Sequence, residues 1–167
     1  GADDAIRIDA PAKDAFFVAT QLSKIAGDYD LILAGIEASD YNGNAVGGML
    51  AELLDFNSVS AVSGINIDGD KFIVNREIDG GSQVLSVTGP LVAIVQKGIA
   101  KEPRIPAMRG IMMARKKPLN VIPAEEAHEK TSFVNFELPP PKAACKMVDE
   151  ENAKELITLL HEEAKVL

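Results

Sequence analysis

The stretch DLILAGIEASDYNGNAVGGMLAELL, residues 30–54, decides the fold class of this chain. It begins with the apolar run 30–36, which predicts a strand buried on both faces of a parallel sheet. It ends at 49–54 with Met and Leu at the spacing of an amphipathic helix. The Gly- and Asn-rich residues 38–48 join the two. A strand, a Gly-rich turn and a helix in this order predict an α/β fold.

The neighbouring segments continue this alternation. Residues 5–8 and 58–67 are strand candidates, and residues 14–25 have apolar side chains at helical spacing. Residues 65–97 then hold two turn signals, Asp68-Gly69 and Asp79-Gly80-Gly81, between β-rich runs, which predicts antiparallel hairpins. The sequence therefore predicts a doubly wound, mostly parallel sheet with an appended β-hairpin.

A long tail follows this domain. Residues 132–138 have a β-like pattern and are followed by three prolines. Residues 149–167 predict an amphipathic helix with Asp149 as its N-cap. One face of that helix carries Leu156, Ile157, Leu160 and Ala164. We expect an α/β nucleotide-binding domain over 1–122 and a C-terminal arm over 123–167, and the helix either packs back on the domain or docks on a partner.

Composition limits the function classes. The 167 residues carry a net charge of −8 with a pI near 4.8, which argues against nucleic acid or an anionic membrane as the main partner. Cys145 is the single cysteine, and no apolar run approaches the ~18 residues of a membrane span. A reduced compartment such as the bacterial cytoplasm is the expected location. GADDAIRI (1–8) lacks Met and resembles the lead-in to an interior strand, so we expect an excised piece of a longer chain.

Residues 38–48 partly resemble two known ligand loops. Asp40, Asn42 and Asn44 match positions 1, 3 and 5 of a calcium-binding EF-hand. Position 6, however, is Ala45 instead of Gly, and position 12 is Ala51 instead of Glu. Calcium is therefore excluded.

The same loop has the glycine spacing of a phosphate-binding P-loop over 43–48, but Met49-Leu50 replaces the required Lys-Ser/Thr pair. A G-x-G-x-x-G dinucleotide motif is absent as well. A Gly-rich turn between a parallel strand and a helix still offers backbone N–H groups to an anion. The spacing leaves open a nucleotide site and a plain connector.

Residues 101–118 form a basic, Met-rich segment in an acidic chain. Its cations, set against Glu102 alone, are Lys101, Arg104, Arg109, Arg115, Lys116 and Lys117. The segment either steers an acidic protein or is a solvated face. The i, i+4, i+5 spacing of Met108, Met112 and Met113 more often indicates core than a docking surface, although Met also suits surfaces with several partners.

Groups for bond-making chemistry are unconvincing. His128 and His161 lie in charged surroundings without ligand-spaced neighbours, and Cys145 has no defensible activating base. No Ser-His-Asp set or carboxylate pair is indicated by spacing. The chain is therefore not expected to be an enzyme.

Four stretches in order resemble the β subunit of electron-transfer flavoprotein. They are DLILAGIEASD (30–40), VNREIDGG (74–81), GPLVAIV (89–95) and EPRIPAMRGIMMARKKP (102–118). The resemblance covers about residues 1–122, and REIDGG and EPR-x5-IMMARKKP are its most specific parts. The family's N-terminal strands are expected to be missing from this chain.

The resemblance implies a fold akin to adenine-nucleotide α-hydrolases and a homologous α subunit as partner. The heterodimer would carry an FAD, held mostly by the α subunit. It would pass electrons from acyl-CoA and other flavin dehydrogenases to a quinone oxidoreductase. The β subunit would bury an AMP, or in bifurcating members a second FAD, and do no bond-making chemistry itself.

Carried onto this sequence, the family's adenylate site falls on the loop after the first apolar run. Its residues here are Gly35, Ala38, Asp40, Tyr41, Asn44, Ala45, Val46 and Gly47. The family usually has a hydroxyl-bearing residue and a Gln in the phosphate-facing turn, where this chain has Gly43, Ala45 and Val46. Fewer side-chain donors make AMP the expected nucleotide rather than a second FAD.

The resemblance also assigns partner contacts. The recognition loop that anchors dehydrogenases would comprise Arg104, Ile105, Pro106, Ala107, Met108, Arg109, Gly110, Ile111, Met112, Arg115 and Lys116. Met108 stands where the family usually has an anchoring Leu, and Glu77 would face the mobile flavin domain. The alternatives are a stand-alone adenine-nucleotide-binding or sensing module and, ranked below it, a hydrolase of the same fold class.

Overall fold

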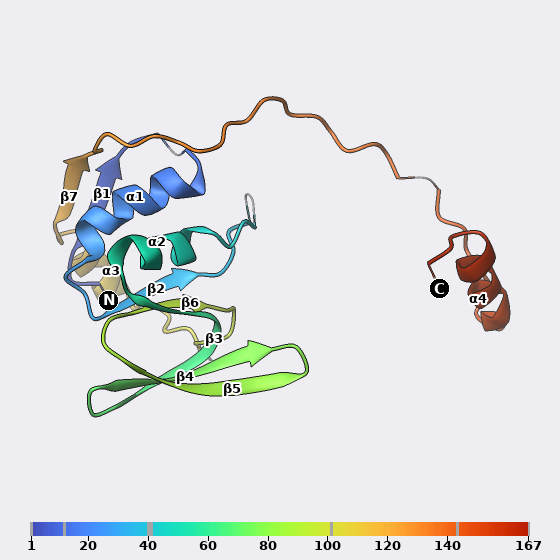
Figure 1. Ribbon diagram of the computed structural model, residues 1–167, viewed down its shortest axis with the longest axis horizontal. Helices are drawn as coiled ribbons and strands as arrows, with labels where there is room; N and C mark the ends of the chain where they lie inside the picture. Colours follow the sequence, from blue (N-terminus) through green and yellow to red (C-terminus); the bar gives the residue numbers. More distant parts are fainter. Residues whose placement is uncertain (1, 12, 40–41, 101, 143, 167) are drawn as a thin grey trace. The chain divides into compact units, whose positions relative to one another are not determined.

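A computed structural model describes residues 2–11, 13–39, 42–100, 102–142 and 144–166 (Figure 1). The chain divides into two compact units, Gly1–Ser132 and Phe133–Leu167. The helices and strands of the first unit are, in order, β1 (Ala5–Asp9), α1 (Ala15–Ala26), β2 (Leu31–Gly35), α2 (Val46–Leu54), β3 (Asn57–Asp68), β4 (Lys71–Ile78), β5 (Gly81–Thr88), β6 (Leu91–Val95), α3 (Met108–Ala114) and β7 (Leu119–Pro123). The second unit contains α4 (Ala153–Glu162).

The main sheet of the described residues has the strand order β2-β6-β3-β4-β5. Strands β2, β6 and β3 are parallel, and β4 and β5 add to β3 in antiparallel pairs. Gly69 and Gly80, with φ of 61° and 80°, close the two hairpins where the sequence predicts turns. Strands β1 and β7 pair in parallel in a second, two-stranded sheet. The expected mixed α/β fold, rich in parallel pairing, is confirmed.

The core lies on both faces of β6, whose sequence LVAIV is apolar throughout. Leu91 and Ala93 point to one side and join Val59, Val62 and Val74 in one buried cluster. Val92 and Ile94 point to the other side and pack with Ala51 of α2. Full burial of a Val or Leu side chain contributes about 1.5–3 kcal/mol, so β6 and its two layers stabilise the unit.

One expectation about β2 is wrong. Residues 30–36 were expected to be buried on both faces, but the side chain of Leu33 is 60% exposed. Strand β2 is the last strand of its sheet, and its pairing with β6 occupies only one of its edges. Burial on both faces is instead a property of β6, at the interior of the sheet.

Helix α1 packs against α2 and begins at a capped end. The Asp14 carboxylate accepts a hydrogen bond from the Phe17 backbone N–H at 2.8 Å. Phe17, Ala19 and Gln21 are the buried residues of α1, so its inner face includes one polar side chain. The partners of that buried amide are described below.

The second unit departs from the sequence prediction in two places. Helix α4 begins after Asn152 rather than after Asp149, whose side chain instead accepts a hydrogen bond from the Glu151 N–H at 2.9 Å. Residues 132–138 form no strand, because no described segment pairs with them as a ladder requires. The rings of Phe133 and Phe136 lie 5.1 Å apart. None of the described helices is long and apolar enough to cross a membrane.

Candidate functional site

The Gly- and Asn-rich loop leaves the carboxyl end of β2, the edge at which open α/β sheets bind ligands. The Ile36 N–H donates to the Val95 carbonyl at 3.0 Å, which continues the pairing of β2 with β6 into the loop. Asn42 and Asn44 have φ of 54° and 43°, a left-handed conformation that Asn tolerates better than most residues. The need for a left-handed backbone conformation thus explains why Asn stands at these two positions, which match the ligand positions of an EF-hand.

Helix α2 starts without a side-chain cap. Its N-cap position is Ala45, whose methyl group accepts no hydrogen bond, and the Met49 N–H closes the first turn onto the Ala45 carbonyl at 3.1 Å. The N–H groups of the first turn have no partner inside a helix. Together with the positive end of the helix dipole, they can hold an anion.

Gly47 determines how closely this helix end approaches the sheet. A Cβ atom built on Gly47 would lie 2.7 Å from Ile94 Cγ1 and 3.3 Å from Ala34 Cβ. A Cβ on the next residue, Gly48, would meet nothing within 4 Å. The first turn of α2 therefore lies directly on β6 and β2, and its solvent side is kept free of side chains at Gly48.

The structure brings part of the expected nucleotide site together. Ala45, Val46 and Gly47 form the start of α2, and Gly35 ends β2. Ala38 and Asn44 are exposed in the connecting loop. Asp40 and Tyr41 lie outside the described residues. Among the described site residues only Asn44 has a polar side chain, and the others offer backbone groups and small apolar side chains.

An apolar hollow of about 500 Å³, which the sequence does not indicate, lies between β1, α1, β2 and α2. Val46 and Leu50 of α2 line it together with Ile6, Leu22 and Leu33. It is therefore next to the start of α2. The apolar residues of these strands and helices are visible in the sequence, but an apolar pattern does not show where packing leaves a hollow.

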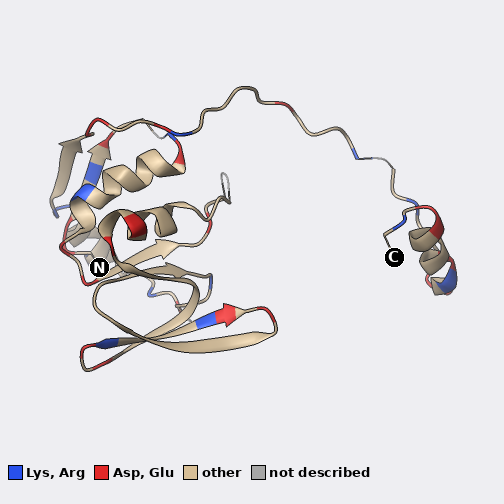
Figure 2. Cartoon of the chain, in the orientation of Figure 1, with Lys and Arg blue, Asp and Glu red and all other residues tan. Residues whose placement is uncertain are grey.

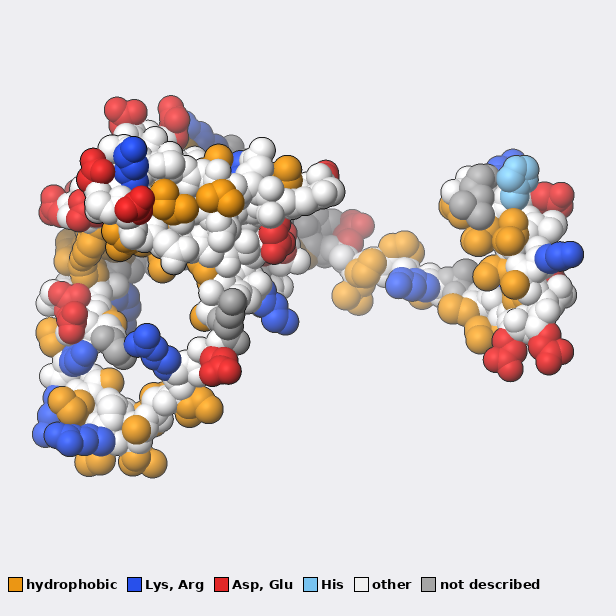
Figure 3. All heavy atoms as spheres, turned by 90° about the horizontal axis from the view of Figure 1, so that it is seen from below, with side chains coloured by type: hydrophobic (Ala, Val, Ile, Leu, Met, Phe, Trp, Pro, Cys, Tyr) orange, Lys and Arg blue, Asp and Glu red, His pale blue; other side chains and the backbone are white. Residues whose placement is uncertain are grey.

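The basic segment, residues 102–118, is exposed to solvent. Met108 is 72% exposed, and Met112 and Met113 are exposed as well, so of the two alternatives left open by their spacing the structure favours a surface over core. The main reason is that α3 makes few contacts with the sheet and has no buried residue. Arg104 and Arg115 border a hollow of about 650 Å³, whose other lining residues are Ile105, Pro106, Gly110, Ile111 and Ala114. Hydrophobic and basic side chains lie next to one another at the lower left of Figure 3.

Charged residues gather at the end of β4. Figure 2 shows them there, whereas β5 and β6 carry none. Glu77 is exposed. Arg76 alternates with it and lies on the face of the buried Val74. The Arg76 Nε atom is buried and has no hydrogen-bond partner among the described residues.

Groups for metal or acid–base chemistry are sparse. Within the described ranges, no three His, Cys, Asp or Glu side chains are grouped so that they could hold a metal. His128, His161 and Cys145 are exposed. Hydrogen bonding, above all from the Phe17 N–H, lowers the pKa of the Asp14 carboxyl from its ordinary value.

Comparison with known proteins assigns the family. A family model described as the electron transfer flavoprotein domain matches residues 1–127. The electron transfer flavoprotein subunit beta of Bacillus subtilis is 34% identical over 183 aligned residues, covering 100% of this chain and 71% of the relative. The corresponding proteins of Syntrophomonas wolfei and Sus scrofa are 37% and 34% identical, covering 90% and 99% of this chain.

This chain spans 61% of the Syntrophomonas wolfei relative and 68% of the Sus scrofa relative. The family model covers more than half of the chain, and the three relatives align with 90% or more of it. The chain therefore belongs to the electron transfer flavoprotein family, among its β subunits.

Proposed function

We propose that the chain holds AMP at the start of α2 and joins an FAD-bearing α subunit in electron transfer. In this proposal the heterodimer takes electrons from acyl-CoA dehydrogenases and similar flavin dehydrogenases and passes them toward a quinone oxidoreductase. The observation that carries the nucleotide site is the uncapped N-terminus of α2 at the carboxyl edge of the parallel strands. The FAD, when bound, supplies the electron-accepting chemistry, and the residues of this chain supply binding and docking.

The charge of the loop favours a monophosphate. Residues 38–48 contain no Lys or Arg, so the loop offers the phosphate no cationic side chain, and backbone N–H groups and the helix dipole are its main source of positive potential. A helix terminus stabilises a nearby anion by about 0.3–1 kcal/mol, and up to about 2 kcal/mol in partly buried geometry. That is sufficient to favour the two charges of AMP, whereas a triphosphate normally requires Lys or a metal ion.

The small residues at the start of α2 are suited to phosphate binding. Gly48 leaves open space beside its backbone, and Ala45 adds only a methyl group. A phosphate oxygen can therefore approach the N–H groups of the first turn without displacing a side chain. The absence of the hydroxyl and amide donors common in the family is compatible with this arrangement.

The basic segment, residues 102–118 with helix α3, is the proposed docking surface for dehydrogenases. It presents the 72% exposed Met108 beside five described cations, with Glu102 as the one acidic residue in 102–118. An exposed Met adapts its shape to different pockets, and cations around it attract an acidic partner and raise the association rate. Glu77 at the end of β4 is proposed to contact the mobile flavin domain of the α subunit.

The second unit is proposed to bind the α subunit. Its extended part exposes Val134 (96%) and Leu138, and α4 exposes Leu156 and Ile157. Exposed apolar side chains in such number commonly mark a surface that a partner covers. In this reading the unit is an arm whose apolar side chains become buried in the heterodimer.

The test is co-expression with an α subunit of the same family. We expect a yellow heterodimer, and a heat-denatured extract of it should release AMP in about the same amount as protein. Release of ATP or of no nucleotide would contradict the AMP site. Nucleotide release from a chain that captures no α subunit would support a stand-alone adenine-nucleotide-binding module instead.

A further inference from the structure

The Asp14 carboxylate joins two segments that are far apart in the sequence. Its Oδ1 atom accepts from the Phe17 N–H at 2.8 Å and caps α1. Its Oδ2 atom accepts from the backbone N–H groups of Lys130 at 2.6 Å and Thr131 at 2.8 Å. The Thr131 hydroxyl donates to the same atom at 3.3 Å. One side chain thus satisfies three backbone donors, two of them 116 and 117 residues away.

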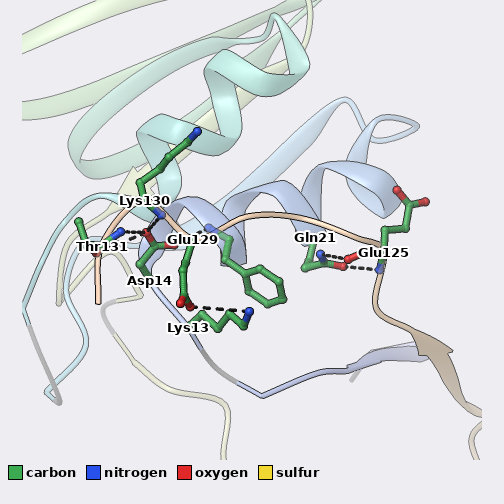
Figure 4. A network of polar contacts seen from close by, with 8 residues as sticks. Lys13, Asp14, Gln21, Glu125, Glu129, Lys130 and Thr131 are labelled. Atoms are coloured by element: carbon green, nitrogen blue, oxygen red, sulfur yellow. Dashed lines mark hydrogen bonds and ion pairs between the residues drawn. The ribbon is translucent and has the colours of Figure 1, made fainter. Parts of the chain in front are cut away.

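A second contact fixes the other end of the same segment. The Gln21 side-chain amide donates to the Glu125 carbonyl at 2.8 Å and accepts from the Glu125 N–H at 2.9 Å. Gln21 lies two helical turns after Asp14 and is only 5% exposed. Residues 125–131 therefore run alongside α1 in the opposite direction (Figure 4). We call this arrangement the α1 clamp: Asp14 and Gln21 with residues 125–131.

The ion pairs beside the clamp contribute less than its backbone contacts. Lys24 lies 3.2 Å from Glu125, and Lys13 lies 3.7 Å from Glu129. All four side chains are at least one-third exposed, so solvent and salt screen these pairs. The directed hydrogen bonds of Asp14 and Gln21 specify one position of the backbone, which an exposed ion pair does not.

We propose that the α1 clamp fixes the start of the C-terminal arm and that Asp14 is a positioning residue for capture of the α subunit. The second unit begins at Phe133, two residues after Thr131. A chain that leaves from a fixed point samples fewer conformations, so less entropy is lost when the arm docks. The existence of the clamp is independent of the proposed function, whereas its effect on partner capture rests on that function.

Asp14→Asn separates the clamp from the helix cap. Asn keeps an oxygen for the Phe17 N–H and is as good an N-cap as Asp. It replaces Oδ2 by an NH₂ group, which cannot accept from Lys130 and Thr131. Asp14→Ala removes both functions. Lys13→Ala removes an exposed ion pair with Glu129 and a cation–π contact with the Phe17 ring, but none of the hydrogen bonds of the clamp, so these two variants are the controls.

The first measurement is amide hydrogen exchange on the full chain. In Asp14→Asn we expect exchange of the Lys130 and Thr131 amides to be faster by about 10-fold or more, as for lost hydrogen bonds to a charged group. Exchange of the Phe17 amide should stay unchanged, and trypsin should cut sooner after Lys130 but not after Lys146. Unchanged exchange at Lys130 and Thr131 would overturn the clamp.

The second measurement is the association rate with the α subunit. We expect Asp14→Asn to associate more slowly than the wild-type chain and Lys13→Ala to associate at the wild-type rate, with equal AMP content in all three. Equal rates for Asp14→Asn and wild type, with faster exchange at residues 130 and 131, would overturn the positioning role but not the clamp. A wild-type chain that captures no α subunit would overturn both the positioning role and the proposed function.

Discussion

Gly47→Ala tests the close approach of helix α2 to the sheet. The added methyl carbon would stand 2.7 Å from Ile94 Cγ1, closer than real Cβ atoms approach, and 3.1 Å from Ile94 Cδ1, tighter than most real Cβ contacts. Overpacking of this kind typically costs about 1–3 kcal/mol. Replacing Gly by Ala in a helix returns at most about 1 kcal/mol. We therefore expect a net loss of up to about 2 kcal/mol in the free energy of unfolding.

Gly48→Ala is the matched control, because a methyl group there meets nothing within 4 Å. It gains the same helix propensity without the contact, so its free energy of unfolding should rise by up to about 1 kcal/mol. Urea unfolding of the two variants should show a difference of about 1–3 kcal/mol. Equal stabilities of the two variants would refute the packing argument.

The double variant Gly47→Ala/Ile94→Ala identifies the atoms responsible. Ile94→Ala alone costs about 2–5 kcal/mol because it leaves a cavity. It also removes the two carbons that the new methyl group would meet. The double variant should therefore be more stable than the sum of the single changes predicts, by about 1 kcal/mol or more. If the stability changes of the two single variants simply add, the contact with Ile94 is not the cause, and the first turn of α2 tilts away from the sheet in Gly47→Ala. In that case the AMP content of the same samples should fall because the helix start has moved.

Three further predictions concern other parts of the chain. Met108→Ala should slow the reduction of the heterodimer's FAD by an acyl-CoA dehydrogenase by about 10-fold, the effect of truncating an interface anchor. The AMP content should stay normal. An unchanged rate of electron transfer would exclude Met108 as the anchor. Hydrogen bonds, above all from the Phe17 N–H and also from Lys130 and Thr131, lower the pKa of Asp14 below its ordinary value of 3.8, and desolvation opposes this shift. The charged side chains drawn around Asp14 are Lys13, Glu129 and Lys130 (Figure 4). The clamp should thus persist above pH 3.8 and be lost as the pH falls through the lower folded-state pKa, which a carboxyl ¹³C titration by NMR would follow; an unshifted Asp14 titration would contradict it. Gly80→Ala, at φ 80°, should cost about 1 kcal/mol in urea unfolding through backbone strain alone, whereas no loss would show that the hairpin relaxes.

The sequence predicted those parts of the fold whose signal is local. Residues 30–54 contain a complete strand, turn and helix, and Asp-Gly turns mark the hairpins, so both were found in their correct places. The antiparallel addition of β4 and β5 followed from the same turns. The nucleotide loop was placed at the end of a strand for the same reason, although its ligand stays a prediction.

Features that depend on distant neighbours were missed. The exposure of Leu33 depends on β2 being an edge strand, and the exposure of Met108 depends on α3 making few contacts with the sheet. The α1 clamp depends on residues more than 100 positions apart, and an Asp before a helix indicates only a cap. Residues 132–138 do not form the expected strand, because a sequence with β propensity still needs a neighbouring strand to pair with.

The position of β6 between β2 and β3 affects the order in which the molecule can be made. Strands β2 and β3 are not neighbours, and each pairs with β6, which is the last of the three in the chain. During synthesis, β2, α2 and β3 leave the ribosome before the strand that joins them exists. The parallel core can therefore form only after residue 95 has emerged, and until then the apolar edges of β2 and β3 stay unpaired. Folding of this unit is expected to be slow for its size and to depend on chaperones during synthesis, since its central contacts are the non-local ones.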